Sequence, residues 1–408
     1  MRVIMVLPYS SLAVGWNFKP DLYADGYHVR LAKELLKRSQ EYKIECWRPE
    51  WKQKHEMNGE KDGISYRSFP SWRPSLGKFT KLFYKRIVTA YAPLRWSLWR
   101  EYSVPLIKAL RKECAKGDAI IVLFNMHFDL SYLICLACKD TPIIGYHIGG
   151  TPYRYSKGSF ISGLPMSLLE NKALSNVRAL LITSESYFHS FERFYKNIPR
   201  IVYPMPWCVD FDLFKPMDKQ ESRKSLGIDS NKKVIIHVGR FDCGKGFDVM
   251  LDVLPELRKR YDLEFIAIGG TKEDMLYQRA IDNGVKAIEW LPHQELVKYY
   301  CASDVYVLPK FYTNHSDPDR FMATGVASEE ALACGIPVVG TNLEGFFTDD
   351  ELKGIGLIPR DKDDFIMCVE DILENPESYA RCREIAMKYF SWTPMVNRLL
   401  NTFKEVAN

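Results

Sequence analysis

Short apolar segments that alternate with helical segments constrain the fold of this chain more than any other feature of its sequence. Each segment is rich in aliphatic, β-branched or aromatic residues, as buried strands are. The first half of the chain has them at Arg2–Leu7, Lys43–Trp47, Ile64–Phe69, Ala119–Leu123, Ile143–His147 and Ala179–Thr183. The second half has them at Lys233–Val238, Leu263–Ile268, Lys286–Trp290, Asp304–Leu308, Pro337–Gly340 and Gly356–Ile358. Such alternation predicts an α/β protein with parallel sheets covered by helices on both faces.

A turn-rich stretch at residues 203–216 separates the two series and contains Pro204, Pro206 and Pro216. The chain has 408 residues, which is too long for one typical hydrophobic core. We therefore expect two doubly wound, Rossmann-like domains, residues 1–205 and 206–388, with a hinge near residues 204–216. A ligand is expected in the cleft between them.

Composition and charge narrow the class of protein. With 26% charged and 47% hydrophobic residues, the chain has a globular composition and not a disordered or fibrous one. Its net charge of +5 fits an anionic ligand or surface, and no nucleic-acid partner is predicted. The chain begins with a strand pattern, and no apolar run reaches the roughly 20 residues that span a bilayer. The prediction is a cytoplasmic protein, attached at most to the inner membrane face.

The ten cysteines are scattered, mostly inside apolar patterns, as buried thiols in a reducing compartment are. Cys135 and Cys138 form one C-x-x-C pair, but no second pair of ligands stands nearby. Buried thiols are therefore favoured over a zinc or redox site, and no metal ligand is predicted.

The segment 322–342 predicts a carboxylate at the edge of a sheet. An Ala-rich helix that carries Glu330 ends at Gly335, and a buried strand follows. In an open parallel sheet, ligands bind beyond the carboxyl ends of the strands. Glu330 is thus expected where a ligand binds, and the vicinal diol of a ribose would supply two hydrogen-bond donors to it. A solvated glutamate on a helix surface is the other interpretation.

A second motif, residues 237–247, follows the strand Lys233–Val238 directly. Its glycines allow a tight turn at the strand end, and Arg240 and Lys245 bring two cations to that turn. A helix that begins near Phe247 would add its positive amino-terminal end, so the motif suits a diphosphate. It matches neither a Walker A loop nor the G-x-G-x-x-G fingerprint, and a Gly-rich turn with solvated cations is the alternative.

Together these motifs resemble the nucleotide-sugar domain of GT-B fold glycosyltransferases of the large retaining family 4, the glycosyl transferases group 1. The resemblance covers nearly all of the second domain. It rests on G-R-x-x-x-x-K-G at 239–246, Phe265–Gly270, Trp290–His293, Tyr299–Pro309 and Glu330–Val339. In the first domain it is looser, through Thr141–His147 and Thr183–Ser184, with Val209–Pro216 at the junction. Residues 389–408 are similar to the family's closing helix, which crosses back to the first domain.

The resemblance implies a role for each residue of the site. Arg240 and Lys245 would hold the donor diphosphate and neutralise the charge of the leaving group, so that no metal or other cofactor is needed. Glu330 would accept hydrogen bonds from the ribose. His147 would lie beside the donor sugar; without the family, a core or capping histidine is favoured. Further donor-binding residues are implied at loops and helix starts that face the ligand, namely Gly26, Gly239, Trp290, Leu291, Gly325, Val326 and Ala327.

Two positions depart from the family pattern. Members usually carry E-x7-E, whose first glutamate contacts the transferred sugar, and the corresponding residue here is Met322. Asp25 precedes Gly26 where the family commonly has two glycines. The loop 310–320 also contains Asp317 and Asp319, a D-x-D pair that holds a divalent cation in a different glycosyltransferase fold; a solvated loop is favoured here.

The segment 73–116 is strongly basic, with eleven Lys or Arg against two Glu and with interleaved Trp and Tyr residues. This composition suits a surface helix that lies on anionic lipid, and a solvated helical face is an equally weighted interpretation.

The resulting prediction is a retaining hexosyltransferase that moves a sugar from a UDP- or GDP-sugar to a glycan or lipid-linked acceptor hydroxyl. A catalytically silent GT-B subunit that only binds nucleotide sugars is the main alternative. A GT-B epimerase or phosphorylase fits the motif order less well, and a nicotinamide-dependent oxidoreductase lacks the glycine fingerprint after its first strand.

Overall fold

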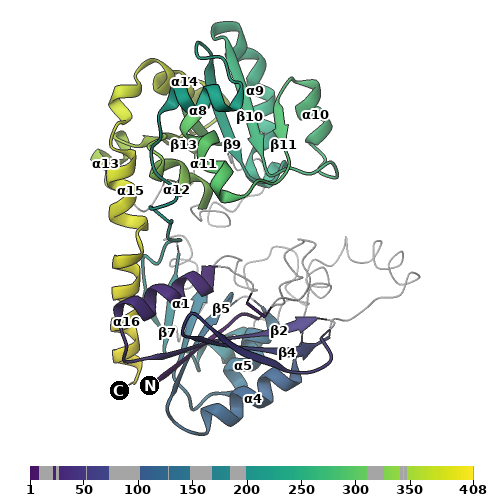
Figure 1. Ribbon diagram of the computed structural model, residues 1–408, viewed down its shortest axis with the longest axis vertical. Helices are drawn as coiled ribbons and strands as arrows, with labels where there is room; N and C mark the ends of the chain where they lie inside the picture. The colour runs from purple at the N-terminus through teal and green to yellow at the C-terminus, as the bar shows by residue number, and fades with distance from the viewer. Residues whose placement is uncertain are drawn as a thin grey trace, which may run out of the picture. The chain divides into compact units, whose positions relative to one another are not determined.

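The structure is a computed structural model, and it describes residues 1–8, 22–23, 27–51, 53–72, 102–126, 128–147, 168–183, 199–309, 326–340, 343 and 347–407. The chain forms two compact units, drawn in Figure 1. Unit 1 consists of Met1–Met205 with Val396–Asn408, and unit 2 is Pro206–Met395. Within the ranges given above, no helix is long and apolar enough to cross a bilayer.

The strands described in unit 1 form one eight-stranded sheet in the order β3-β4-β2-β1-β5-β6-β7-β8. All neighbouring strands pair in parallel except β3 and β4. The strands are β1 (Arg2–Val6), β2 (Lys43–Trp51), β3 (Met57–Lys61), β4 (Ile64–Ser71), β5 (Ala119–Phe124), β6 (Ile143–His147), β7 (Ala179–Ile182) and β8 (Arg200–Val202). The strand order reverses beside β1, between β2 and β5, as in a doubly wound fold.

The helices of unit 1 include α1 (Tyr27–Arg38), α4 (Val104–Cys114), α5 (Asp129–Ala137) and most of α16 (Trp392–Ala407). In Figure 1, α4 and α5 lie side by side. The last helix, α16, packs on unit 1, where Phe403 contacts Tyr42 with ring centroids 5.3 Å apart. Arg178 also donates to the carbonyl oxygen of Val406 at 2.7 Å. These contacts attach the end of the chain to the first unit.

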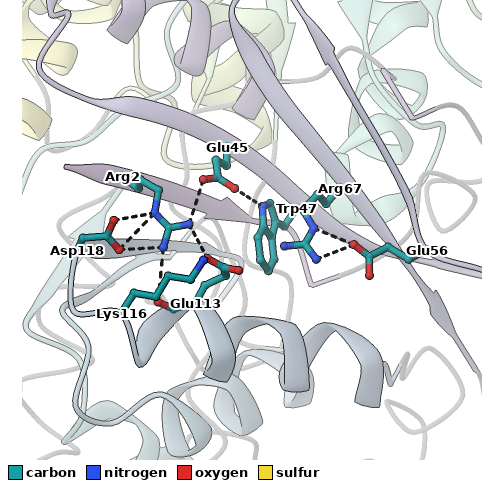
Figure 2. Close-up of polar contacts among 8 residues, drawn as sticks. All are labelled: Arg2, Glu45, Trp47, Glu56, Arg67, Glu113, Lys116 and Asp118. Carbon is teal, nitrogen blue, oxygen red and sulfur yellow. Dashed lines mark hydrogen bonds and ion pairs between the residues drawn. The ribbon is translucent and has the colours of Figure 1, made fainter.

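Arg2 holds together the amino-terminal edge of the unit 1 sheet (Figure 2). Its guanidinium donates to Asp118 at 2.9 Å, Glu113 at 2.7 Å and Glu45 at 3.4 Å. The hydrogen bond from Arg2 lowers the pKa of Asp118. The indole of Trp47 donates to the other Glu45 oxygen at 3.0 Å. This network joins β1 and β2 to the elements around β5. It lies at the sheet edge opposite the carboxyl ends of the strands, so we infer that it stabilises the fold.

Unit 2 contains, among its described residues, a six-stranded parallel sheet in the order β11-β10-β9-β12-β13-β14. Alternate residues of each strand enter different apolar cores, because successive side chains point to opposite faces. Val234 and Ile236 belong to one core, and Ile235 belongs to the other. The strands are β9 (Lys233–Val238), β10 (Leu263–Ile268), β11 (Lys286–Ile288), β12 (Val305–Leu308), β13 (Val338–Gly340) and β14 (Gly356–Leu357).

Helices cover both faces of this sheet. The first core contains residues of α11, α12 and α15, and the second contains residues of α9 and α14. The helical elements of the described part of unit 2 are α8 (Lys219–Leu226), η3 (Cys243–Lys245), α9 (Phe247–Arg260), α10 (Tyr277–Asp282), α11 (His293–Ala302), α12 (Val326–Ala333), α13 (Asp349–Lys353), α14 (Lys362–Glu374), η6 (Pro376–Tyr379) and α15 (Cys382–Phe390).

The predicted strands are all confirmed, within a few residues at their ends, and the described residues contain two strands that were not predicted. One is β3, which pairs antiparallel with β4, so the expectation of parallel pairing throughout is wrong at this sheet edge. Its sequence, Met-Asn-Gly-Glu-Lys, is mostly exposed and carries no alternating apolar signal. The other, β8, has three residues, which is too short for a pattern.

The cysteines of the C-x-x-C pair lie in and just after α5, and both are buried. Burial raises the pKa of Cys135 to about 12, which keeps this thiol protonated at neutral pH. Across the described ranges, no group of three or more His, Cys, Asp or Glu side chains is arranged to hold a metal ion.

Candidate functional site

The carboxyl ends of β9 and β12 mark the point where the strand order of unit 2 reverses. β9 pairs with β10 on one side and with β12 on the other. Helices that leave two neighbouring strands in opposite directions open a crevice at their carboxyl ends, which is where ligands bind in sheets of this kind. The predicted loop 239–246 follows β9 directly, and α12 lies between β12 and β13 in the chain.

The loop after β9 is packed against the loop after β10. The backbone N–H of Gly239 donates to the carbonyl oxygen of Ile268 at 2.8 Å. Gly269 has φ 104°, and a Cβ at this position would lie 3.1 Å from the carbonyl oxygen of Gly239. A side chain there would both strain the backbone and press on the first loop. Glycine at 269 therefore lets the two strand ends approach closely.

A tight turn then leads into α9. The N–H groups of Lys245 and Phe247 donate to the carbonyl oxygen of Asp242, at 3.0 and 3.3 Å. Gly246 takes the left-handed conformation, with φ 69°, immediately before the helix. The first turn of α9 thus starts at the predicted residue and directs its positive end toward the loop.

Two cations meet at this turn. Arg240 is 71% exposed, and its Nη1 lies 2.7 Å from a carboxylate oxygen of Asp242. Lys245 is half-buried, and burial, with a smaller effect of Arg240, lowers its pKa, while Asp242 acts in the opposite direction. A bound anion would relieve the repulsion between the two cations. The arrangement is therefore suited to a diphosphate, as predicted from the sequence.

A buried aromatic cluster supports the turn. Phe241 stacks on Phe247 with ring centroids 4.2 Å apart, and His237 lies 5.2 Å from Phe247. The imidazole of His237 is fully buried, which lowers its pKa to about 4 and keeps the ring neutral at pH 7. Its Nδ1 is 3.1 Å from the carbonyl oxygen of Val307, so it donates to that strand. The cluster fixes the backbone on either side of Arg240.

Glu330 lies on α12 and is only 5% exposed. The sequence suggested a carboxylate that faces a cleft. In the structure the carboxylate accepts a hydrogen bond from the hydroxyl of Tyr300, with Oη and Oε2 3.1 Å apart. Arg383 supports the end of this helix by donating to the carbonyl oxygen of Ala333 at 2.7 Å.

Tyr306 connects this carboxylate to the loop after β9. Its ring centroid lies 6.3 Å from that of Tyr300. Its hydroxyl donates to the carbonyl oxygen of Val238 at 3.4 Å, next to Gly239. Burial, followed by the charge of Glu330, raises the pKa of Tyr306. The predicted ribose and diphosphate residues thus belong to one region of unit 2.

The predicted base-binding loop follows β11 and is joined to the same region. The N–H of Gly269 donates to the carbonyl oxygens of Ile288 and Glu289, each at 3.0 Å. Trp290 is 54% exposed, and Leu291 is partly buried. An exposed indole beside a polar turn offers a surface on which a base can stack.

The structure describes only some of the remaining predicted site residues. Val326 and Ala327 form the start of α12, where Val326 is exposed. His147 is the last residue of β6, in register with Ile182, and its side chain lies outside the described part of the structure. Several predicted positions also lie outside the described residues: Gly26, Met322, Gly325, the Asp317/Asp319 pair and the basic stretch 73–101.

Comparison with known proteins agrees with this geometry. The family model for glycosyl transferases group 1 matches residues 218–389, which lie within unit 2 and include Arg240, Lys245 and Glu330. The similarity to the glycosyl transferases group 1 family is therefore shown for this part of the chain. Unit 1 lies outside the matched range.

Two relatives of this chain are named as glycosyltransferases. A D-inositol 3-phosphate glycosyltransferase of Saccharomonospora viridis is 27% identical over 327 residues, which cover 72% of this chain and 73% of the relative. An uncharacterised glycosyltransferase of Methanocaldococcus jannaschii is 25% identical over 210 residues. In that comparison the chain spans about half of the relative's length, 51%.

Solved structures identify the fold of the chain as GT-B. Sucrose-phosphate synthase from Thermosynechococcus elongatus has a TM-score of 0.69 at 16% identity, over 99% of this chain and 98% of that one. HepE from Anabaena, solved with UDP, has a TM-score of 0.64 at 14% identity, over 99% and 100%. At these identities the likeness concerns the fold alone.

Three residues near the site were not predicted: Asp242, His237 and Tyr300. Asp242 lies between the two cations in the sequence, and an acidic residue in a cationic turn could have been predicted as a site residue. In the sequence, His237 has the context of an ordinary residue of a buried strand, and Tyr300 that of an ordinary residue on a buried helix face. Nothing local indicates their partners, Val307 and Glu330, which are 70 and 30 residues away.

Proposed function

We propose that this chain is a retaining glycosyltransferase that transfers a sugar from a nucleotide-diphosphate sugar to an acceptor hydroxyl. The observation that carries the proposal is the position of Arg240 and Lys245, on one turn between the end of β9 and the start of α9, at the switch point of unit 2. The family match over residues 218–389 and the nearby buried Glu330 support the same assignment.

In the proposed reaction, negative charge grows on the donor diphosphate as the glycosidic bond breaks. Arg240, Lys245 and the amino-terminal end of α9 stabilise that charge without reorganising, so the proposal assigns this task to the protein and not to a metal ion or other cofactor. The acceptor hydroxyl attacks on the face that the diphosphate leaves, and the departing phosphate oxygen takes its proton. The anomeric configuration is then retained without a protein nucleophile.

The donor is proposed to be a UDP- or GDP-sugar. Support comes from HepE, which was solved with UDP, and from the ribose chemistry expected of Glu330. The acceptor is proposed to be a glycan or a lipid-linked hydroxyl bound on the side of unit 1. His147, Gly26, Gly325 and Met322 keep their predicted places beside the donor in this proposal.

A donor screen tests the function. We expect one class among UDP-, GDP- and ADP-sugars to raise the melting temperature by about 5 °C at a concentration near a hundred times its Kd. The shifting donor should then release its nucleoside diphosphate in the presence of acceptor. The anomeric configuration of the product, read by NMR, tests retention.

The same donor screen distinguishes a transferase from a subunit that only binds nucleotide sugars. Met322, in place of the usual glutamate, makes a silent binding subunit the second candidate. Donor binding without release or transfer against any acceptor would favour that subunit, and no binding by any nucleotide sugar would contradict both assignments.

We also propose that the basic segment 73–116 docks on anionic lipid. In its described part, Lys108, Arg111 and Lys112 of α4 are exposed. Changing these three residues to Glu should weaken binding to phosphatidylserine vesicles at low salt by about tenfold or more, because each basic residue contributes about 1 kcal/mol near such a surface. The matched control changes three exposed lysines of unit 2, Lys259, Lys272 and Lys298, and should bind as the unmodified protein does. Unmodified protein that ignores the vesicles would contradict the proposal.

A further inference from the structure

Tyr300 is fully buried on α11 and makes one polar contact that bears on the site, its hydrogen bond to Glu330. Its ring packs against Phe214 in a T-shaped arrangement, with centroids 6.2 Å apart, and also contacts Tyr306. Close packing on several sides leaves a buried ring a single rotamer. The position of its hydroxyl is therefore set by the core and not by Glu330.

The direction of this hydrogen bond is fixed by chemistry. Burial and the charge of Glu330 raise the pKa of Tyr300 well above its ordinary value, so the hydroxyl stays protonated. A protonated phenol donates, and an ionised carboxylate can only accept. A carboxylate as buried as Glu330 also requires hydrogen-bond donors to remain ionised. Tyr300 supplies one such donor from a rigid position.

The hydrogen bond from Tyr300 takes one acceptor direction of the Glu330 carboxylate. A carboxylate has two oxygens and about four lone-pair directions, so it can accept from more than one donor. A bond from Tyr300 to Oε2 orients the carboxylate plane, and a vicinal diol requires a defined plane for bidentate binding.

We propose that Tyr300 is a positioning residue, whose hydroxyl holds the Glu330 carboxylate in the orientation that binds the donor ribose. The inference rests on the proposed function, in which Glu330 is the ribose acceptor group. Tyr300 itself touches neither the donor nor the reacting atoms in this account.

The test measures discrimination of the ribose hydroxyls, which a purely structural role would not change. For the unmodified protein, calorimetry gives the Kd of UDP and of 2′,3′-dideoxy-UDP. The same comparison is made with GDP and 2′,3′-dideoxy-GDP. The nucleotide that binds more tightly, with its dideoxy form, is then used for the variants. The unmodified protein should prefer the ribose form by about 10- to 100-fold. Glu330→Gln should remove most of this preference, and Tyr300→Phe should reduce it by about five- to tenfold.

Tyr379→Phe is the matched control. Tyr379 is a buried tyrosine of unit 2 whose hydroxyl also donates to a carboxylate, that of Asp371, between η6 and α14. The substitution removes the same kind of bond away from the site, so the ribose preference should not change. Thermal unfolding of each variant reports any loss of stability separately.

The double variant Tyr300→Phe/Glu330→Gln also removes the buried charge that Tyr300→Phe leaves with one donor fewer, so it can fold where the single variant does not. Since Tyr300 acts through Glu330, the double variant should show the same ribose preference as Glu330→Gln. A further loss in the double variant, or an unchanged preference in Tyr300→Phe, overturns the inference and leaves the proposed function standing. An unchanged preference in Glu330→Gln, or no nucleotide binding at all, removes the ribose role of Glu330 and the inference with it.

Discussion

Replacing Lys245 with alanine is expected to slow sugar transfer by about 10²–10³-fold while weakening nucleoside binding much less. Removing one preorganised group that stabilises developing charge typically costs about this much in rate. Lys245 is half-buried, so its charge acts on a bound diphosphate with little screening by water. The measurement is kcat for transfer, compared with the Kd of the nucleoside that lacks the diphosphate.

Arg240→Ala should also slow sugar transfer more than it weakens nucleoside binding, but the loss of rate should be smaller than in Lys245→Ala. The Arg240 side chain is 71% exposed and already paired with Asp242, so its charge is better screened. Lys259→Ala is the control, because this lysine is 71% exposed and pairs with Glu256 at the far end of α9. Turnover that stays unchanged in both Lys245→Ala and Arg240→Ala would refute the assignment of the diphosphate site.

Replacing Phe247 with alanine is expected to lower the free energy of unfolding by about 3–5 kcal/mol. Phe247 is the first residue of α9 and is fully buried, between Phe241 and Phe265 at centroid distances of 4.2 and 6.0 Å. Removing a large buried ring loses its transfer free energy and leaves a cavity. Urea and thermal unfolding measure the loss, and donor affinity should fall as well, because the ring supports the turn of Arg240 and Lys245.

Two further variants of unit 2 provide reference values for this loss of unfolding free energy. Phe247→Leu keeps an apolar side chain and should lose less than the alanine variant. Met367→Ala removes an apolar side chain that is 59% exposed on α14 and should change stability by less than about 0.5 kcal/mol. A loss below about 1 kcal/mol in Phe247→Ala would show that the aromatic cluster does not stabilise this unit.

Local patterns predicted much of the fold because the relevant physics is local. The strand β9 and the loop 239–246 were recognisable from consecutive apolar residues followed by glycines and cations. Gly335, with φ 84°, ends the turn after α12 where the sequence placed it. The polar edge strand β3 was not recognisable, because an exposed strand buries no apolar face and leaves no pattern.

The sequence by itself was sufficient for the α/β class, the GT-B resemblance and the two cations at one turn, since each depends on neighbouring residues. The tertiary structure was required for the contact of Glu330 with Tyr300, because the two residues lie on different helices. It was also required for the strand order that brings β9 beside β12. Hydrogen bonds and strand pairs of this kind join residues that are distant in the chain, and no periodicity within either segment encodes the partner.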